Sequence, residues 1–271
     1  MPETAATAGL RRRQTADRVM PVLVALLALC AWEGIVRWRG LPAYILPAPS
    51  LIARTLVTDW DTLWPAWLIT LKITVLALLA SVVGGVGLAF LFTLNRWIER
   101  SLFPFAIILQ VTPIIAIAPL ILIYAPNTLS ALLLCAWIVA FFPVLSNTVT
   151  GLRSADRNLQ DLFTLYGATR WQRLRLLLAP SALPYFLAGL RIAGGLSLIG
   201  AVIAEFTAGT AGQESGLAWR ILEASFRLNV ARMFAALALI SVTGIAIFLA
   251  LNILTRKLIG HWHESQLPER R

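Results

Sequence analysis

The residues whose types and spacing are most informative lie between Asp161 and Pro180, where the chain reads DLFTLYGATRWQRLRLLLAP. Gly167 follows the acidic residue by six positions, and Pro180 follows that glycine by thirteen. Arg170 and Arg173 share one side of the second half, where their guanidinium groups can meet carboxylates of a partner. Because a long apolar segment flanks the stretch on each side, it forms a polar loop that leaves a membrane and returns to it. These residues predict recognition of another molecule at the membrane surface.

Local signals in this loop predict two short helices. The first runs from about Asn158 to Tyr166 and ends at Gly167, because glycine tolerates the left-handed conformation at a helix end. Thr169 is expected to cap the second helix, and Gln172 three positions later completes a capping box.

The second helix is expected to carry one apolar stripe, because Trp171, Leu174 and Leu178 recur at helical spacing. Pro180 and Pro184 then redirect the chain into the next membrane segment. On composition alone, a solvated loop whose basic residues face lipid headgroups fits equally well, since basic cytoplasmic loops are the rule.

The spacing of the loop resembles the cytoplasmic signature of ABC-importer permeases, which consists of a Glu-Ala-Ala triplet, a spaced glycine and an Ile-x-Leu-Pro sequence. Here the triplet is Asp161-Leu162-Phe163 and the end is Leu177-Leu178-Ala179-Pro180, so the acid, the glycine and the proline fit while the other positions differ. In that family the loop forms a coupling helix that sits in a groove of a separate ATPase subunit. The resemblance therefore implies ATPase-coupling roles for Asp161, Gly167, Ala168, Arg170, Trp171, Arg173 and Pro180.

The composition predicts an integral membrane protein. Hydrophobic residues make up 59% of the 271 residues and charged residues only 13%, whereas soluble domains carry about 25% charged residues. Six apolar runs are long enough, at roughly 20 residues each, to span a bilayer. They are Met20–Trp38, Leu68–Leu94, Phe103–Tyr124, Leu129–Val149, Ala182–Ile203 and Met233–Leu254. We therefore predict an all-α, polytopic bundle of about six transmembrane helices, like a type I ABC-importer permease.

The distribution of charge connects the formal net charge of +10 with membrane topology and excludes nucleic acid as a partner. When the N-terminus is placed in the cytoplasm, most of the 23 Lys and Arg residues fall on the cytoplasmic side, as the positive-inside rule requires. The sequence thus predicts a multi-pass protein of the bacterial inner membrane with both termini in the cytoplasm. It divides into a tail (1–18), a transmembrane permease domain (19–259) with the coupling loop (151–183), and a second tail (260–271).

A proline-rich turn, Leu41 to Ser50, follows the first span and leads into an amphipathic helix on the outer surface. Ser50 is expected to cap that helix. The Ile-Leu-Pro-x-Pro turn resembles the sulfonate, taurine and nitrate branch of importer permeases, which also handles pyrimidine precursors. Glu33, inside the first span, is either functional or paired with Arg37 one turn away.

Small and polar residues in the spans suggest close packing and a translocation path. Gly84, Gly85 and Gly87 let helix backbones approach each other closely. Pro113 and Pro119 break the backbone ladder of the third span, and freed carbonyls are tolerated only in a buried or cavity-lining position. The candidate path residues are Gln110, Thr112, Pro113, Asn147, Ser197 and Glu205. For each of them a purely structural role is the alternative: a kink, a hydrogen bond between helices, or, at Glu205, simple hydration.

These features predict the permease subunit of an ATP-driven importer for a small, anionic or polar solute. The resemblance implies ABC ATPase subunits, a periplasmic binding protein and a second permease copy as partners. Since the chain lacks a Walker sequence, it is expected to be non-catalytic and to hold no cofactor. An isolated pair, His261 and His263, does not suggest a metal site. The alternatives are an intramembrane enzyme, which needs a catalytic constellation at membrane depth, and a self-contained carrier, which usually shows internal repeats.

Overall fold

The computed structural model describes residues 3–209 and 215–259, with side chains from residue 19 onward, and every regular element in these ranges is a helix. Five helices are long and apolar enough to cross a membrane, and a bent pair forms a sixth crossing when counted together. The five are α1 (Glu3–Arg39), α3 (Trp60–Leu94), α6 (Thr128–Arg153), α9 (Ala179–Ala208) and α11 (Val230–Ile259). The prediction of an all-α membrane bundle of about six spans is confirmed.

Most of the predicted N-terminal tail lies within the described residues, whereas the predicted C-terminal tail does not. α1 begins at Glu3, inside the segment predicted as an N-terminal tail. The C-terminal tail (260–271), including His261 and His263, lies outside the described residues.

The third predicted span is not one continuous helix. It consists of α4 (Arg96–Val111) and α5 (Ile114–Tyr124), which meet at an angle of 105°. At the break, Thr112 is extended with φ −73° and ψ 122°, because the ring of Pro113 disfavours helical backbone in the preceding residue. The Ile108 carbonyl accepts both from the Thr112 backbone N–H at 3.0 Å and from the Thr112 hydroxyl at 2.7 Å, which closes the last turn of α4. The prolines were expected to interrupt the ladder, but a near right angle is more than an ordinary kink.

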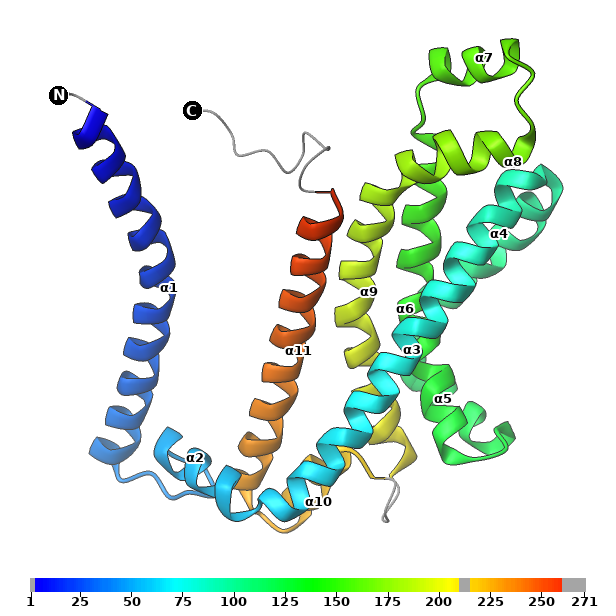
Figure 1. Ribbon diagram of the computed structural model, residues 1–271. Helices are drawn as coiled ribbons and strands as arrows, with labels where there is room; N and C mark the ends of the chain where they lie inside the picture. The colour runs from blue at the N-terminus through cyan, green and yellow to red at the C-terminus, as the bar shows by residue number, and fades with distance from the viewer. Residues whose placement is uncertain (1–2, 210–214, 260–271) are drawn as a thin grey trace.

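The short helices lie at the two ends of the bundle (Figure 1). At one end lie α7 (Arg157–Leu165), α8 (Arg170–Arg173) and the π-helix η1 (Leu174–Leu178). The opposite end carries α2 (Pro49–Thr58) and α10 (Leu217–Phe226). The first turn of α1 and the last turn of α11 point to the same end as α7. The loop therefore lies on the same side of the bundle as the two ends of the described chain.

The start of α2 corrects the prediction for Ser50. The N-cap residue of α2 is Ala48, which makes no side-chain cap, and Ser50 lies inside the first turn. Its backbone N–H and its hydroxyl donate to the Glu33 carboxylate at 3.0 and 2.7 Å. Arg37 pairs with the same carboxylate at 2.6 Å, which confirms the predicted Glu33–Arg37 pair. A carboxylate from α1 thus satisfies donors at a helix start that the local sequence leaves open.

The core of the bundle is the contact between α6 and α9, where glycine allows the two backbones to touch. A Cβ atom built on Gly189 of α9 would lie 2.6 Å from the Pro143 carbonyl oxygen of α6. The same test at Gly200 places a Cβ 2.8 Å from Cα of Ala136, and at Gly151 it places one 2.8 Å from Cα of Ala182. Because no side chain larger than hydrogen fits at these points, the glycines set the distance between the helices.

The three glycines of α3 that the sequence predicts at close helix contacts differ in the space around them. A Cβ on Gly85 would lie 2.9 Å from Cγ1 of Val144, so close packing is confirmed there. Gly84 has ordinary contact space, 3.4 Å from Phe141, and Gly87 faces no atom within 4 Å. The sequence pattern identified the right helix, but the glycines of α9 were missed because their partners lie on a helix distant in sequence.

We predict that Gly189→Ala destabilises the purified protein by roughly 1–3 kcal/mol, because the added methyl group must push α6 and α9 apart. The measurement is the thermal unfolding midpoint in detergent, followed by intrinsic fluorescence. Gly195→Ala is the matched control on the same helix, because nothing lies within 4 Å of a Cβ there. Equal midpoints for the two variants would contradict the close approach.

Candidate functional site

The loop between α6 and α9 has the backbone that its sequence predicts. Asp156 caps α7 by accepting from the Asn158 backbone N–H at 2.7 Å, and α7 ends at Leu165. Gly167 has φ +66°, and the next amide, that of Ala168, donates to the Phe163 carbonyl at 2.9 Å. The predicted helix end at Gly167 is confirmed, and it is a position where a residue with a side chain is strained.

The start of α8 is the predicted capping box. The Gln172 backbone N–H donates to the Thr169 hydroxyl at 3.2 Å, and the Thr169 backbone N–H donates to Oε1 of Gln172 at 2.8 Å. Two donors at the helix start are thereby satisfied within four residues of sequence.

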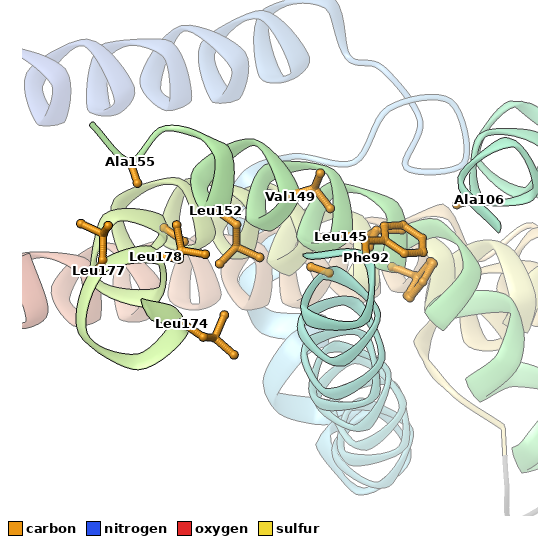
Figure 2. Packing of buried hydrophobic residues seen from close by; sticks show 12 residues of the cluster. Phe92, Ala106, Leu145, Val149, Leu152, Ala155, Leu174, Leu177 and Leu178 are labelled. Atoms are coloured by element: carbon orange, nitrogen blue, oxygen red, sulfur yellow. The ribbon is translucent and has the colours of Figure 1, made fainter. Parts of the chain in front are cut away.

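The predicted apolar stripe is wrong for Trp171. Leu174 and Leu178 are buried, together with Leu177, but the Trp171 side chain is 67% exposed. Trp171 lies in the short helix α8, whereas the three buried leucines all lie in the π-helix η1 that follows it. In Figure 2, Leu174, Leu177 and Leu178 lie beside Leu152 of α6, within one buried cluster. The loop is thus anchored to the membrane bundle by leucines and leaves the tryptophan outside.

An apolar surface remains on the outer side of the loop. Leu165 is 85% exposed and Tyr166 83% exposed, and none of the residues of α7 is buried. With Trp171 they form what we call the loop surface: Leu165, Tyr166 and Trp171. The sequence reasoning missed Leu165 and Tyr166, although apolar residues at 159, 162 and 165 follow helical spacing and could have indicated an apolar face.

The charged and small residues of the loop divide between its outer and inner sides. Asp161 and Arg170 are exposed, whereas Ala168 and Pro180 are half-buried. Arg173 turns inward: its Nη2 donates to the Thr164 hydroxyl at 2.5 Å, and its Nε is buried without an acceptor among the described residues. Of the predicted partner-facing cations, the structure therefore places Arg170 outside and Arg173 inside the loop.

The candidate path residues do not form one cluster. Gln110, Thr112 and Pro113 lie together at the break between α4 and α5, where Gln110 and Pro113 are exposed. Asn147 donates to the Pro143 carbonyl of its own helix at 2.8 Å, and the buried Ser197 donates to the Gly194 carbonyl at 2.9 Å. The last two satisfy their donors locally.

Glu205 connects three helices near the end of the bundle opposite the loop. It is only 3% exposed, so the hydrated alternative is wrong. Its carboxylate accepts from the Ala218 backbone N–H at 3.0 Å, while the neighbouring Leu217 N–H donates to the Thr70 hydroxyl at 2.9 Å. A Cβ on Gly216 would lie 2.1 Å from Oε1 of Glu205, so the carboxylate fits only against glycine. Glu205 and Thr70 thus cap the first turn of α10 from α9 and α3.

Comparisons with known proteins agree with this architecture. The family model for the binding-protein-dependent transport system inner membrane component matches residues 81–260. The chain is 32% identical over 247 residues to the formylaminopyrimidine transport permease protein ThiX of Halalkalibacterium halodurans, covering 91% of this chain and 96% of that protein. It is 34% identical over 248 residues to the riboflavin transport system permease protein RibX of Chloroflexus aurantiacus, covering 91% of this chain and 90% of that protein.

A solved structure is similar in fold. It is an inward-facing conformation of the MetNI methionine ABC transporter, with a TM-score of 0.61 over 78% of this chain and 98% of that chain. At 18% sequence identity this likeness shows the fold alone.

We predict that Glu205→Ala loosens the start of α10 without unfolding the bundle. The lost acceptor leaves the Ala218 N–H unsatisfied in a buried position, which costs roughly 1–3 kcal/mol. Hydrogen–deuterium exchange of the Leu217 and Ala218 amides should accelerate accordingly. Glu223→Ala, which removes partly exposed ion pairs on α10 itself, should leave those two amides unchanged. Equal exchange in the two variants would show that Glu205 does not hold the helix.

Proposed function

Since this chain belongs to the family of binding-protein-dependent transport system inner membrane components, we propose that it forms the translocation path of an importer and receives its energy through the loop between α6 and α9. Hydrolysis of ATP takes place on a separate ATPase subunit, which holds the loop in a groove. The observation that carries this proposal is the loop surface. Leu165, Tyr166 and Trp171 form an exposed apolar patch on a segment that projects from the end of the bundle (Figure 1).

The exposed patch supports a protein partner for the loop. Large apolar side chains gathered on an exposed helix mark an interaction site, because burying them in a partner is favourable by about 25 cal/mol per Å². Arg170 and Asp161, both exposed, supply charges beside the patch that can pair with the partner.

The anchoring of the loop supports a mechanical role. Leu174, Leu177 and Leu178 pack against the end of α6, and the chain then continues directly into α9. When ATP binding closes the ATPase pair, a displacement of the loop is transmitted through these leucines to α6 and α9. The bundle then switches between inward- and outward-facing states, which couples hydrolysis to transport.

The opposite end of the bundle is proposed to receive a periplasmic binding protein that delivers the solute. There α2 and α10 lie across the ends of the spanning helices, and Glu205 fixes the start of α10. We propose a small, polar or anionic solute that passes the α4–α5 break at Gln110, Thr112 and Pro113, with Asn147, Ser197 and Glu205 as further candidates. The names of the two relatives refer to formylaminopyrimidine and riboflavin, so a polar nitrogen heterocycle is the first solute to test.

A second copy of the chain is proposed to complete the path. Only 6% of the apolar part of α1 is buried within this chain, and Trp32 of α1 contacts Phe234 of α11 with ring centroids 5.6 Å apart. The exposed length of α1 is available to a second copy or to lipid. The positive-inside rule places the end with the loop, and with it both termini, in the cytoplasm.

Gly167→Val tests the coupling role. A β-branched residue is strained at φ +66°, so the variant should turn α8 away and displace the loop surface. We expect solute-stimulated ATP hydrolysis and uptake to fall at least tenfold in reconstituted vesicles, while membrane abundance stays near normal. Gly40→Val is the matched control, because Gly40 has φ +59° and open space but lies at the opposite end. If the Gly167 variant transports like the Gly40 variant, the loop is only a connector.

The number of copies is a separate prediction. Because one loop can serve one ATPase, a two-ATPase transporter needs two loops. We expect native mass spectrometry of the purified complex to show two copies of this chain per two ATPases. One copy paired with a different permease would overturn the homodimer but not the coupling.

A further inference from the structure

A cavity of about 690 Å³ lies where the loop meets the ends of α3, α4 and α6. Four guanidinium groups line it, from Arg96 of α4, Arg153 of α6, and Arg170 and Arg173 of the loop, together with one carboxylate, that of Glu99. The proposed coupling role uses Arg170, but it does not account for Arg96, Arg153 and Arg173 at the same cavity.

Most of these guanidinium groups lack an anionic partner. Arg153 forms an ion pair with Glu99, and Arg173 donates only to the neutral Thr164 hydroxyl. Among the described residues Arg96 and Arg170 take part in no ion pair. The Nε of Arg173 is buried without an acceptor, which is costly for a charged group. An anion in the cavity would pair with the exposed guanidinium groups of Arg96 and Arg170 and relieve the repulsion between the cations.

The cavity also has an apolar wall. Phe92 of α3 and Val149 and Leu152 of α6 line it, and the same residues belong to the buried cluster of Figure 2. Thus a cationic rim at the end of the bundle adjoins an apolar wall formed by spanning helices. This combination suits an amphiphile with an anionic head, since basic pockets between transmembrane helices hold anionic lipid headgroups.

We propose that this cavity, the arginine cavity, binds the phosphate group of an anionic phospholipid, with an acyl chain against Phe92, Val149 and Leu152. The forked guanidinium donors suit phosphate oxygens. Because the lining comes from α3, α4, α6 and the loop, the bound lipid would tie the loop to the bundle. This site goes beyond the proposed function and does not require transport for its test.

The test is native mass spectrometry of the complex as purified from membranes, with dioleoyl phosphatidylglycerol and dioleoyl phosphatidylcholine as probes. We expect selective retention of phosphatidylglycerol. Arg96→Gln and Arg170→Gln should each lower its affinity roughly tenfold, the effect of one charge-assisted hydrogen bond. Arg100→Gln is the matched control, because Arg100 is an exposed cation on α4 that does not line the cavity.

Four results would overturn the proposal. The first is an equal loss of phosphatidylglycerol affinity in the Arg96 and Arg100 variants, and the second is equal retention of the two lipids. Either would mean that the lipid responds to general surface charge and not to the cavity. Displacement of the lipid by millimolar inorganic phosphate would assign the cavity to a soluble phosphate ligand. Failure of the assembled complex to retain phosphatidylglycerol would show that the arginine cavity does not bind this lipid. Loss of transport by itself bears only on the proposed function.

Discussion

The close approach of α6 and α9 is the constraint on which the rest of the structure depends. Their backbones meet at Gly151, Gly189 and Gly200, where any Cβ would overlap the facing helix. Such contacts leave little freedom of sliding, because packed small-residue interfaces have few alternative registers. The two helices therefore act as one rigid pair. The loop that connects them is held in a fixed position as a result.

The loop between α6 and α9, which contains α7, α8 and η1, joins these two helices, so its position follows from theirs. Three buried leucines fix its inner side, and Gly167 with the capping box of Thr169 and Gln172 fixes the direction of its outer side. What remains exposed is an apolar surface that the chain itself does not cover. At the other end, Glu205 and Thr70 hold α10 from two spanning helices. A force applied to the loop thus acts on the same helix, α9, whose Glu205 holds α10 at the opposite end of the bundle.

Sequence reasoning succeeded where a structure depends on neighbours in sequence. The left-handed glycine, the capping box and the Glu33–Arg37 pair all follow from spacings of four residues or fewer, and each is present. It failed where a distant partner decides the outcome. The Glu33 carboxylate accepts from the Ser50 donors, Glu205 is buried against the start of α10, and packing against α6 buries the leucines but not Trp171. The positions of the spans were predictable from hydropathy, and Pro113 predicted that the third span is interrupted, but the 105° size of the bend could not be predicted from the sequence.

The central claim is that the loop surface contacts an ATPase subunit, and site-specific photo-crosslinking tests it most directly. The probe is p-benzoylphenylalanine placed at Trp171, which is 67% exposed on the loop, or at Phe226, which is 77% exposed at the opposite end. Illumination of intact cells should crosslink position 171 to an ATPase subunit, and position 226 should give no such product. Absence of an ATPase crosslink from position 171, or its appearance from position 226, would contradict the account.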